Sequence, residues 1–450
     1  MAVRDAVRAN DVSTTTLRKI RNHLLPLLFL LYIVAFLDRG NVAFAALTMN
    51  AELGLTPVQF GLLAGIFFWG YFLFEIPSNL LLHKIGARIW IARILVTWGV
   101  VATLTGLVHS AAQLYSARFL LGVAEAGFFP GIALYLTYWF PQREQARVLS
   151  LFLAALPVSS ILGAPVSGFI LDHVHWFGIS SWRWLLILEG LPAIACGALT
   201  YLLLPNRPSE AKFLTPVEQD WITSELAREE QEKTGGHSMS AWRALAHPRV
   251  WQMAAAHLGS NLAFYGMSFY MPQAIKSLSG VYSNTTVGIL VMVPYLAGLV
   301  AMILVARSSD ARLERRYHAA VPAIIAGIAL MSLGASNSPM LSIILWSLTA
   351  IGICSYWGPF WSMPSQFLAG YSAASGIALI NSIAALGGFI GPSVVGAVAT
   401  GTRGIYGGLA LGGVCLMASA ALILLLPIAV VRANHPSRGW NRLAQSNRRS

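Results

Sequence analysis

The chain has 450 residues, of which 56% are hydrophobic and 11% are charged, with 30 Lys and Arg against 18 Asp and Glu. In soluble proteins roughly a quarter of the residues are charged, so this composition excludes a soluble multidomain protein and indicates one that crosses a membrane many times. The surplus of basic residues lies in the tails and in alternate loops. That distribution sets membrane topology and does not indicate nucleic-acid binding.

The first long apolar run, residues 24–47, can cross a bilayer, yet it carries Asp38, Arg39 and Asn41 at its centre. A charged side chain at the bilayer centre costs ~2.5–3.5 kcal/mol on insertion scales, so such groups usually face a pathway or another helix. We therefore expect this helix to form the charged wall of a transport route. The alternative is a salt-bridged pair with a structural role.

Apolar runs of spanning length recur about twelve times and predict an all-α integral membrane protein. The expected spans are 24–47, 58–82, 89–108, 112–139, 147–171, 183–204, 250–275, 286–306, 318–335, 340–362, 372–399 and 404–431. We expect residues 1–204 to form one six-helix bundle, 205–248 a charged cytoplasmic loop with a solvated helix, and 249–450 a second six-helix bundle. The basic tails and central loop predict that both termini are cytoplasmic.

The two halves show weak internal repetition. When they are aligned with one constant offset, Gly61 falls on Gly288 and Pro165 falls on Pro392. Together with the six-plus-six count, this predicts two bundles related by a pseudo-two-fold axis along the membrane normal, as in many transporters.

The fourth span contains Arg118 and Glu125, which lie two helical turns apart and therefore on one face, ~10 Å apart along the axis. Gly122 lies between them and leaves room for a ligand or for a partner helix. A buried carboxylate can take and release a proton near neutrality, and a nearby arginine opposes protonation. An organic anion that binds the arginine would therefore favour protonation of Glu125, which is a physical basis for symport. The alternative is that Arg39–Asp38 and Arg118–Glu125 pairs only tie helices together.

Glu75 and Glu189 also lie within spans, and we expect a gating or structural role for them. Glu75 is expected to pair with loop arginines, and Glu189 lies near Arg183. The second half has no equivalent charges in its spans. Its mid-membrane polar and aromatic residues are Asn261, Tyr265, Gln273, Tyr356, Trp357, Trp361 and Asn381. Amide and phenol groups suit substrate hydroxyls, so this set favours a polar, hydroxylated acid.

We predict no metal site and no cofactor. Asp172, His173 and His175 lie in a loop without a partner cluster of metal-binding residues. The three cysteines (196, 354 and 415) are widely spaced in apolar segments and are expected to be packing residues.

Four stretches carry a family resemblance: AFLDRGNVA (35–43), YFLFEIPSN (71–79), RFLLGVAEAGFFP (118–130) and WRWLLILEGLP (182–192). With them the chain resembles the major facilitator superfamily, and within it the anion:cation symporter family of organic-anion transporters. The resemblance implies that Asp38 and Glu125 are the coupling protonation sites. It also implies that Arg39 and Arg118 recognise substrate or organise the network around it. The first copy of the superfamily's loop motif differs from the usual pattern, because it has Asn79 and His83. The second copy has Asp310, which we expect to act in gating.

From these observations we predict a proton-coupled symporter that imports a small organic anion by alternating access. Its substrate would be a hydroxy-dicarboxylate, a sugar acid or an aromatic carboxylate. The expected substrate-binding residues are Arg39, Asn41, Arg118, Tyr265, Tyr356, Trp357 and Asn381, with Arg39 as the carboxylate clamp. The expected partners are the anion, H⁺ and the lipid of the plasma membrane, with the protein acting as a monomer. The alternatives are a proton-independent exchanger or efflux carrier, and a transporter-like sensor; an enzyme is not expected, since no nucleophile–base constellation occurs.

Overall fold

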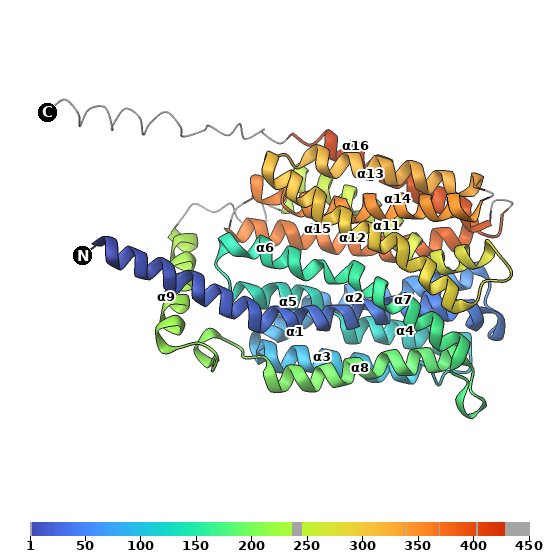
Figure 1. Cartoon of the computed structure of the whole chain (residues 1–450), viewed down its shortest axis with the longest axis horizontal. Helices are drawn as coiled ribbons and strands as arrows, with labels where there is room; N and C mark the ends of the chain where they lie inside the picture. Colours follow the sequence, from blue (N-terminus) through green and yellow to red (C-terminus); the bar gives the residue numbers. More distant parts are fainter. Residues whose placement is uncertain (1, 236–244, 337, 369, 402–403, 428–450) are drawn as a thin grey trace.

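The computed structural model describes residues 2–235, 245–336, 338–368, 370–401 and 404–427. In these residues every regular element is a helix, as the composition predicts. Figure 1 shows most of the helices lying side by side along the long axis of the molecule. The predicted C-terminal tail, and the last residues of the span expected over 404–431, lie outside the described residues.

The first half of the chain forms eight α-helices and a short 3-10 turn. They are α1 (Ala2–Glu52), α2 (Pro57–Ile85), α3 (Ala87–Thr105), α4 (Ala111–Glu125), α5 (Phe128–Thr137), α6 (Gln142–Leu153), α7 (Ala155–His173), η1 (Trp176–Gly178) and α8 (Ser181–Leu203). The spans expected over 112–139 and 147–171 are therefore each two helices in succession. The first break falls at Gly127, whose φ of 84° belongs to the left-handed region that glycine tolerates best.

The second half forms six long helices. They are α11 (Pro248–Ser277), α12 (Asn284–Arg312), α13 (Arg316–Ser332), α14 (Pro339–Trp361), α15 (Gly370–Val398) and α16 (Gly404–Leu424). Short 3-10 turns, η3 (Leu333–Ala335) and η4 (Pro364–Gln366), follow α13 and α14. Figure 1 shows this half, coloured yellow to red, lying along the blue-to-green first half.

The segment that joins the halves contains η2 (Pro208–Glu210) and α9 (Pro216–Gly235). Helix α9 lies across one end of the bundle in Figure 1, near the N-terminus. It is fixed to the first half by an ion pair of 2.8 Å between Lys19 Nζ and Glu218 Oε1, and by Phe213 stacking on His23. Hydrogen bonds from Lys19 and Thr215 hold the pKa of Glu218 below its ordinary value, although partial burial acts in the opposite direction. We call this end of the molecule the α9 end and the opposite end the distal end.

Eleven helical segments of the described chain are long and apolar enough to cross a membrane. They correspond to all the expected spans except the seventh, which is α11. Helix α11 is 30 residues long but contains His257, Asn261 and Gln273 among its apolar residues. It packs against α1, α12, α15 and α16, so other helices and not lipid surround its polar positions.

The internal repetition has a direct counterpart in the packing of the two halves at the distal end. A Cβ atom on Gly61 of α2 would lie 2.4 Å from the carbonyl oxygen of Pro392 on α15. A Cβ atom on Gly288 of α12 would lie 2.2 Å from the carbonyl oxygen of Ala164 and 3.0 Å from Cα of Pro165 on α7. Because Gly61 aligns with Gly288 and Pro392 with Pro165, one contact maps onto the other, as a two-fold relation between the halves requires. Small residues here let the helix backbones of the two halves meet.

We predict that Gly288→Ala forces the halves apart at the distal end. An added methyl group 2.2 Å from a carbonyl oxygen cannot be accommodated without backbone movement, which typically costs about 1–3 kcal/mol. Spin labels at the exposed positions His175 and Val281, with the native cysteines replaced by alanine, should report a longer or broader distance distribution. Gly61→Ala should act in the same way.

Gly358→Ala is the matched control, since a Cβ atom there meets only Ala306 Cβ at 3.6 Å, an ordinary contact. An unchanged distance distribution in both Gly288→Ala and Gly61→Ala would show that these contacts do not hold the halves together.

Candidate functional site

Asp38 and Arg39 at the centre of α1 face different surroundings, because successive residues of a helix point about 100° apart. Asp38 is 1% exposed and accepts hydrogen bonds from Nε1 of Trp98 on α3 and from Nδ2 of Asn41, the latter at 3.1 Å. Arg39 instead faces the space between the halves, where its side chain is 11% exposed. Only the second of the two adjacent charges therefore lines a cavity between the halves.

Arg39 forms an ion pair with Glu125, the last residue of α4. Its Nε donates to Oε1 of Glu125 at 2.7 Å, and a terminal nitrogen lies 2.5 Å from the same oxygen. The Glu125 side chain is 1% exposed, and its Oε2 has no hydrogen-bond partner. Because α4 ends at Glu125 and the chain turns at Gly127, this carboxylate lies at a helix end that points at α1.

The pairs considered from the sequence, Arg39–Asp38 and Arg118–Glu125, do not form in the described structure. The two members of the first pair are adjacent and diverge around the helix. In the second, Glu125 is held by Arg39, and the Arg118 guanidinium lies beside the Phe67 ring instead.

Arg118 is 2% exposed, and its Nε and one terminal nitrogen have no hydrogen-bond partner. Its guanidinium lies 5.4 Å from the centre of the Phe67 ring. The glycine between Arg118 and Glu125 admits a partner helix and not a ligand: a Cβ atom on Gly122 would lie 2.0 Å from the carbonyl oxygen of Phe67 on α2. Arg118 is thus buried next to α2 and is not among the residues that line the two compartments at the centre of the protein.

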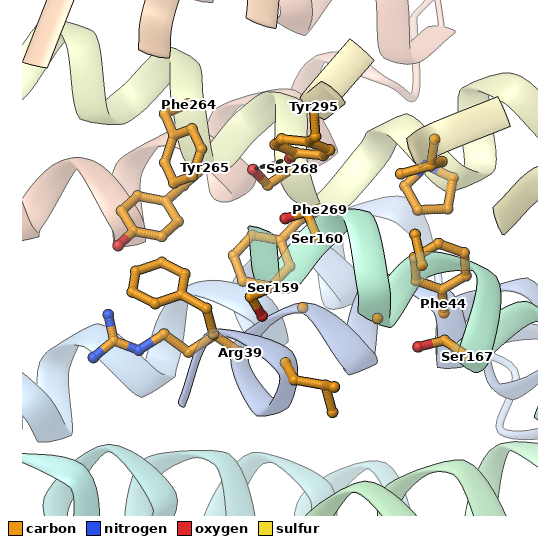
Figure 2. Close-up of a pocket in the computed structure, with 17 residues that line it drawn as sticks. Arg39, Phe44, Ser159, Ser160, Ser167, Phe264, Tyr265, Ser268, Phe269 and Tyr295 are labelled. Carbon is orange, nitrogen blue, oxygen red and sulfur yellow. Dashed lines mark hydrogen bonds between the residues drawn. The ribbon is translucent and has the colours of Figure 1, made fainter. Parts of the chain in front are cut away.

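Two adjoining compartments lie between the halves, and Arg39 lines both. We call the first the serine compartment; it has a volume of about 620 Å³, counting the part open to solvent. Figure 2 shows Ser159, Ser160 and Ser167 of α7 around it, with the Ser268–Tyr295 hydrogen bond of 3.0 Å opposite. The Arg39 guanidinium lies at one side of this compartment, and the Tyr265 hydroxyl points toward it.

The second, which we call the aromatic compartment, has a volume of about 730 Å³ by the same measure. Its lining consists of Tyr32, Phe36, Arg39, Phe68, Tyr71, Phe129, Leu153, Leu156, His257, Asn261, Phe264, Tyr265, Trp357, Trp361, Asn381 and Ala385. Residues of both halves therefore meet around one charged side chain.

The structure brings together some of the expected substrate-binding residues. Tyr265 lines both compartments, and Trp357 and Asn381 line the aromatic compartment. Tyr356 and Asn41 are buried and line neither. The Tyr356 hydroxyl has no hydrogen-bond partner, and its ring stacks on Phe360.

The acidic residues assigned to gating or structure occupy three different settings. Glu75 is 6% exposed and accepts a 3.2 Å hydrogen bond from Nδ2 of Asn381. Its expected pairing with loop arginines is therefore replaced by a bond that joins the two halves. Glu189 accepts from Ser167 at 2.7 Å, while its neighbour Arg183 pairs with Glu52. Asp310 is largely exposed and forms an ion pair with Arg315.

Two further residues were not expected from the sequence. His257 lines the aromatic compartment, is 4% exposed, and its Nδ1 has no hydrogen-bond partner. Asp172 caps the start of α12 by accepting hydrogen bonds from the backbone nitrogens of Asn284 at 3.1 Å and Thr285 at 2.7 Å. The only sequence signal for His257 was that it is a lone histidine in an apolar run. Nothing in the sequence indicates that residues 172 and 284 are in contact.

The setting of Asp38 leads to a prediction on stability. Trp98→Phe removes a hydrogen bond to a charged group, worth about 1.5–3 kcal/mol, if Asp38 is ionised in the folded protein. Trp90→Phe on the same helix removes a neutral bond to Ser78, worth about 0.5–1.5 kcal/mol, with the same change of ring. Denaturant titration in mixed micelles should therefore show a greater loss of unfolding free energy for Trp98→Phe.

Equal losses in the two variants would mean that Asp38 carries a proton in the folded state. Repeating the pair in an Asp38→Asn background provides the control, since a neutral acceptor should bring the Trp98→Phe loss down to that of Trp90→Phe.

Comparison with known proteins agrees with this architecture. The sequence profile of the Major Facilitator Superfamily matches residues 28–392. A protein of Agrobacterium vitis named "Putative tartrate transporter" is 44% identical over 94% of this chain and 93% of its own length. The "Putative metabolite transport protein NicT" of Pseudomonas putida is 38% identical over 92% of this chain and 94% of its own.

Among solved structures, the fold is similar to that of a bacterial homologue of the human lysosomal transporter Spinster in an inward-facing, unoccupied conformation. The TM-score is 0.67 at 18% sequence identity, over 90% of this chain and 95% of the other. The family is one of transporters and not of enzymes. The chain belongs to the Major Facilitator Superfamily and is a multi-pass membrane transporter of small molecules.

Proposed function

We propose that the protein is a proton-coupled symporter of the anion:cation symporter type, which imports a small organic anion by alternating access. The observation that carries the proposal is the Arg39–Glu125 pair at the cavity wall. Arg39 is accessible from the cavity, whereas Glu125 lies behind it and is almost completely buried. A substrate carboxylate would take the place of Glu125 at the guanidinium, which binds carboxylates through two parallel bonds.

Displacement of Glu125 from Arg39 favours protonation of Glu125. Once its bond to Arg39 is lost, a buried carboxylate with no other partner is far more stable when protonated. Binding of the anion and uptake of the proton then favour each other, and release of either favours release of the other. The relatives' names, tartrate transporter and metabolite transport protein, are consistent with an organic-acid substrate.

The remaining residues are assigned by their positions. We propose Tyr265, Trp357 and Asn381 as substrate contacts, and Arg118 with Asp38 as groups that tune the charge around Glu125. Asn41 supports Asp38, and Tyr356 supports the aromatic wall. Glu75 and Asp310 act in gating, and Glu189 in structure.

The orientation belongs to the same proposal. The α9 end faces the cytoplasm, and the distal end, where the halves meet through Gly61 and Gly288, faces outward. The described state would then be closed to the outside, in the inner or plasma membrane, with a single chain as the functional unit. Residues 1–204 and 249–450 are the two bundles that rock about the cavity.

We expect gradient-driven uptake of one organic acid into proteoliposomes from a radiolabelled panel. Glu125→Gln should abolish accumulation but retain exchange, because the amide cannot carry the proton. Arg39→Ala should reduce uptake about a hundredfold or more, since loss of one partner of a buried charged contact costs roughly 2–5 kcal/mol in binding. Glu144→Gln, on α6 and outside the cavity, is the control and should transport as the wild type does.

Arg39→Ala leaves Glu125 buried without a partner, so its folding must be measured alongside transport. The double variant with Glu125→Gln removes both charges and should melt at a higher temperature than Arg39→Ala while remaining inactive. Uptake that is indifferent to the proton gradient and to Glu125 would instead indicate an exchanger.

A further inference from the structure

The described lining of the cavity contains one basic side chain. Arg39 is the only Lys or Arg among the described residues that line the serine and aromatic compartments. Arg118 is buried and belongs to neither lining. The cavity wall therefore offers one site for one carboxylate.

Aromatic rings dominate the space next to that site. Nine of the sixteen residues that line the aromatic compartment are Phe, Tyr or Trp, whereas these types make up 11% of the chain. Several rings meet edge to face, including Phe68 against Tyr265 at 4.5 Å and Phe264 against Trp357 at 5.0 Å between centroids. Such a wall suits a flat ring, which can add further stacked and edge-to-face contacts.

The amide nitrogens of the same compartment are engaged in hydrogen bonds. Nδ2 of Asn261 donates to the carbonyl oxygen of Ala384 at 3.1 Å, and Nδ2 of Asn381 donates to Glu75. Nδ1 of His257, in contrast to these amides, is buried and has no hydrogen-bond partner. The His257 ring is held by stacking on Phe360 at 4.7 Å and by the edge of Trp361 at 5.0 Å. A buried polar atom without a partner is costly, so a ligand that completes its hydrogen bond gains affinity.

We infer that the substrate is an aromatic monocarboxylate that carries a ring hydroxyl. This rests on the site of the proposed function and names its substrate class. Arg39 binds the carboxylate, the aromatic wall holds the ring, and Nδ1 of His257 forms a hydrogen bond with the hydroxyl. A hydroxyl can donate or accept, so it satisfies either tautomer of His257.

The same features disfavour the binding of tartrate and of sugar acids. A second carboxylate, as in tartrate, would be buried among aromatic rings with no second cation in the described lining. Burial of an unpaired charge is strongly unfavourable. A sugar acid would place several hydroxyls against a wall made mostly of aromatic rings.

The test measures equilibrium binding of three probes to the purified full-length protein by scintillation proximity: 4-hydroxybenzoate, benzoate and tartrate. The variants are His257→Phe, which keeps a stacking ring, and His257→Gln, which keeps a donor and an acceptor. His175→Phe, in an exposed distal turn, is the matched control. Melting temperatures are recorded for each, and uptake of the same probes is measured in proteoliposomes with an inward proton gradient.

We expect 4-hydroxybenzoate to bind about tenfold more tightly than benzoate, as one hydrogen bond to a buried group provides, and tartrate to bind most weakly. His257→Phe should bring the two aromatic acids to equal affinity, while His257→Gln and His175→Phe keep the preference. Should His257→Phe fail to fold, His257→Leu tests the same point: it also removes both ring nitrogens and should likewise bring the two aromatic acids to equal affinity.

Two results would overturn the inference: tartrate binding more tightly than either aromatic acid, or an unchanged preference in a folded His257→Phe. Gradient-driven accumulation of tartrate would overturn this inference alone and support symport. Histidine-dependent binding of 4-hydroxybenzoate without any accumulation would overturn symport and leave the substrate class in place.

Discussion

The buried ion pair between Arg39 and Glu125 constrains everything around it. Removing one partner of such a pair costs roughly 3–5 kcal/mol because the other charge is left buried and alone. The two residues come from different helices, so α1 and the end of α4 must keep a fixed relation for the pair to exist. The neighbouring charge, Asp38, is satisfied separately by Trp98 and Asn41. The cluster is therefore stable only as long as each carboxylate has its own donor, and Arg39 alone can exchange its partner for a ligand.

The contacts between the halves at the distal end differ from those nearer the α9 end. At the distal end, backbones meet through Gly61 and Gly288, and Asp172 caps α12 from the other half. Nearer the α9 end, the halves are joined by a hydrogen bond between side chains, Glu75 and Asn381. Backbone contacts through glycine are broken only by moving whole helices, whereas a side-chain bond can be broken by a rotamer change. The repetition of the glycine contact by symmetry means that both sides of the distal end must open together.

The sequence was sufficient for the helical class, for the positions of nearly all spans and for the charged residues at the centre of α1 and α4. Membrane helices need ~20 apolar residues, and the cost of placing a charge among them makes such positions visible. The partner of each charge could not be predicted, because pairing depends on the rotation and spacing of helices that are distant in sequence. The partner considered for Arg39 as an alternative was Asp38, but Arg39 bonds Glu125; Glu75 was expected beside arginines but bonds Asn381. His257 was overlooked since a histidine within an apolar helix gives no sign of which helix it faces.

The cavity is asymmetric in a way that links recognition to movement. The first half contributes the only guanidinium of the described lining, and the second half contributes His257 and both indole rings. A ligand that reaches both Arg39 and His257 makes one strong contact with each half. It therefore favours the conformation in which the distance between these two residues matches the length of the ligand. A ligand too short to reach both gains nothing from that arrangement and cannot shift its population. Length and substituent position on the substrate, more than charge alone, would then decide which acids drive the change between the two states.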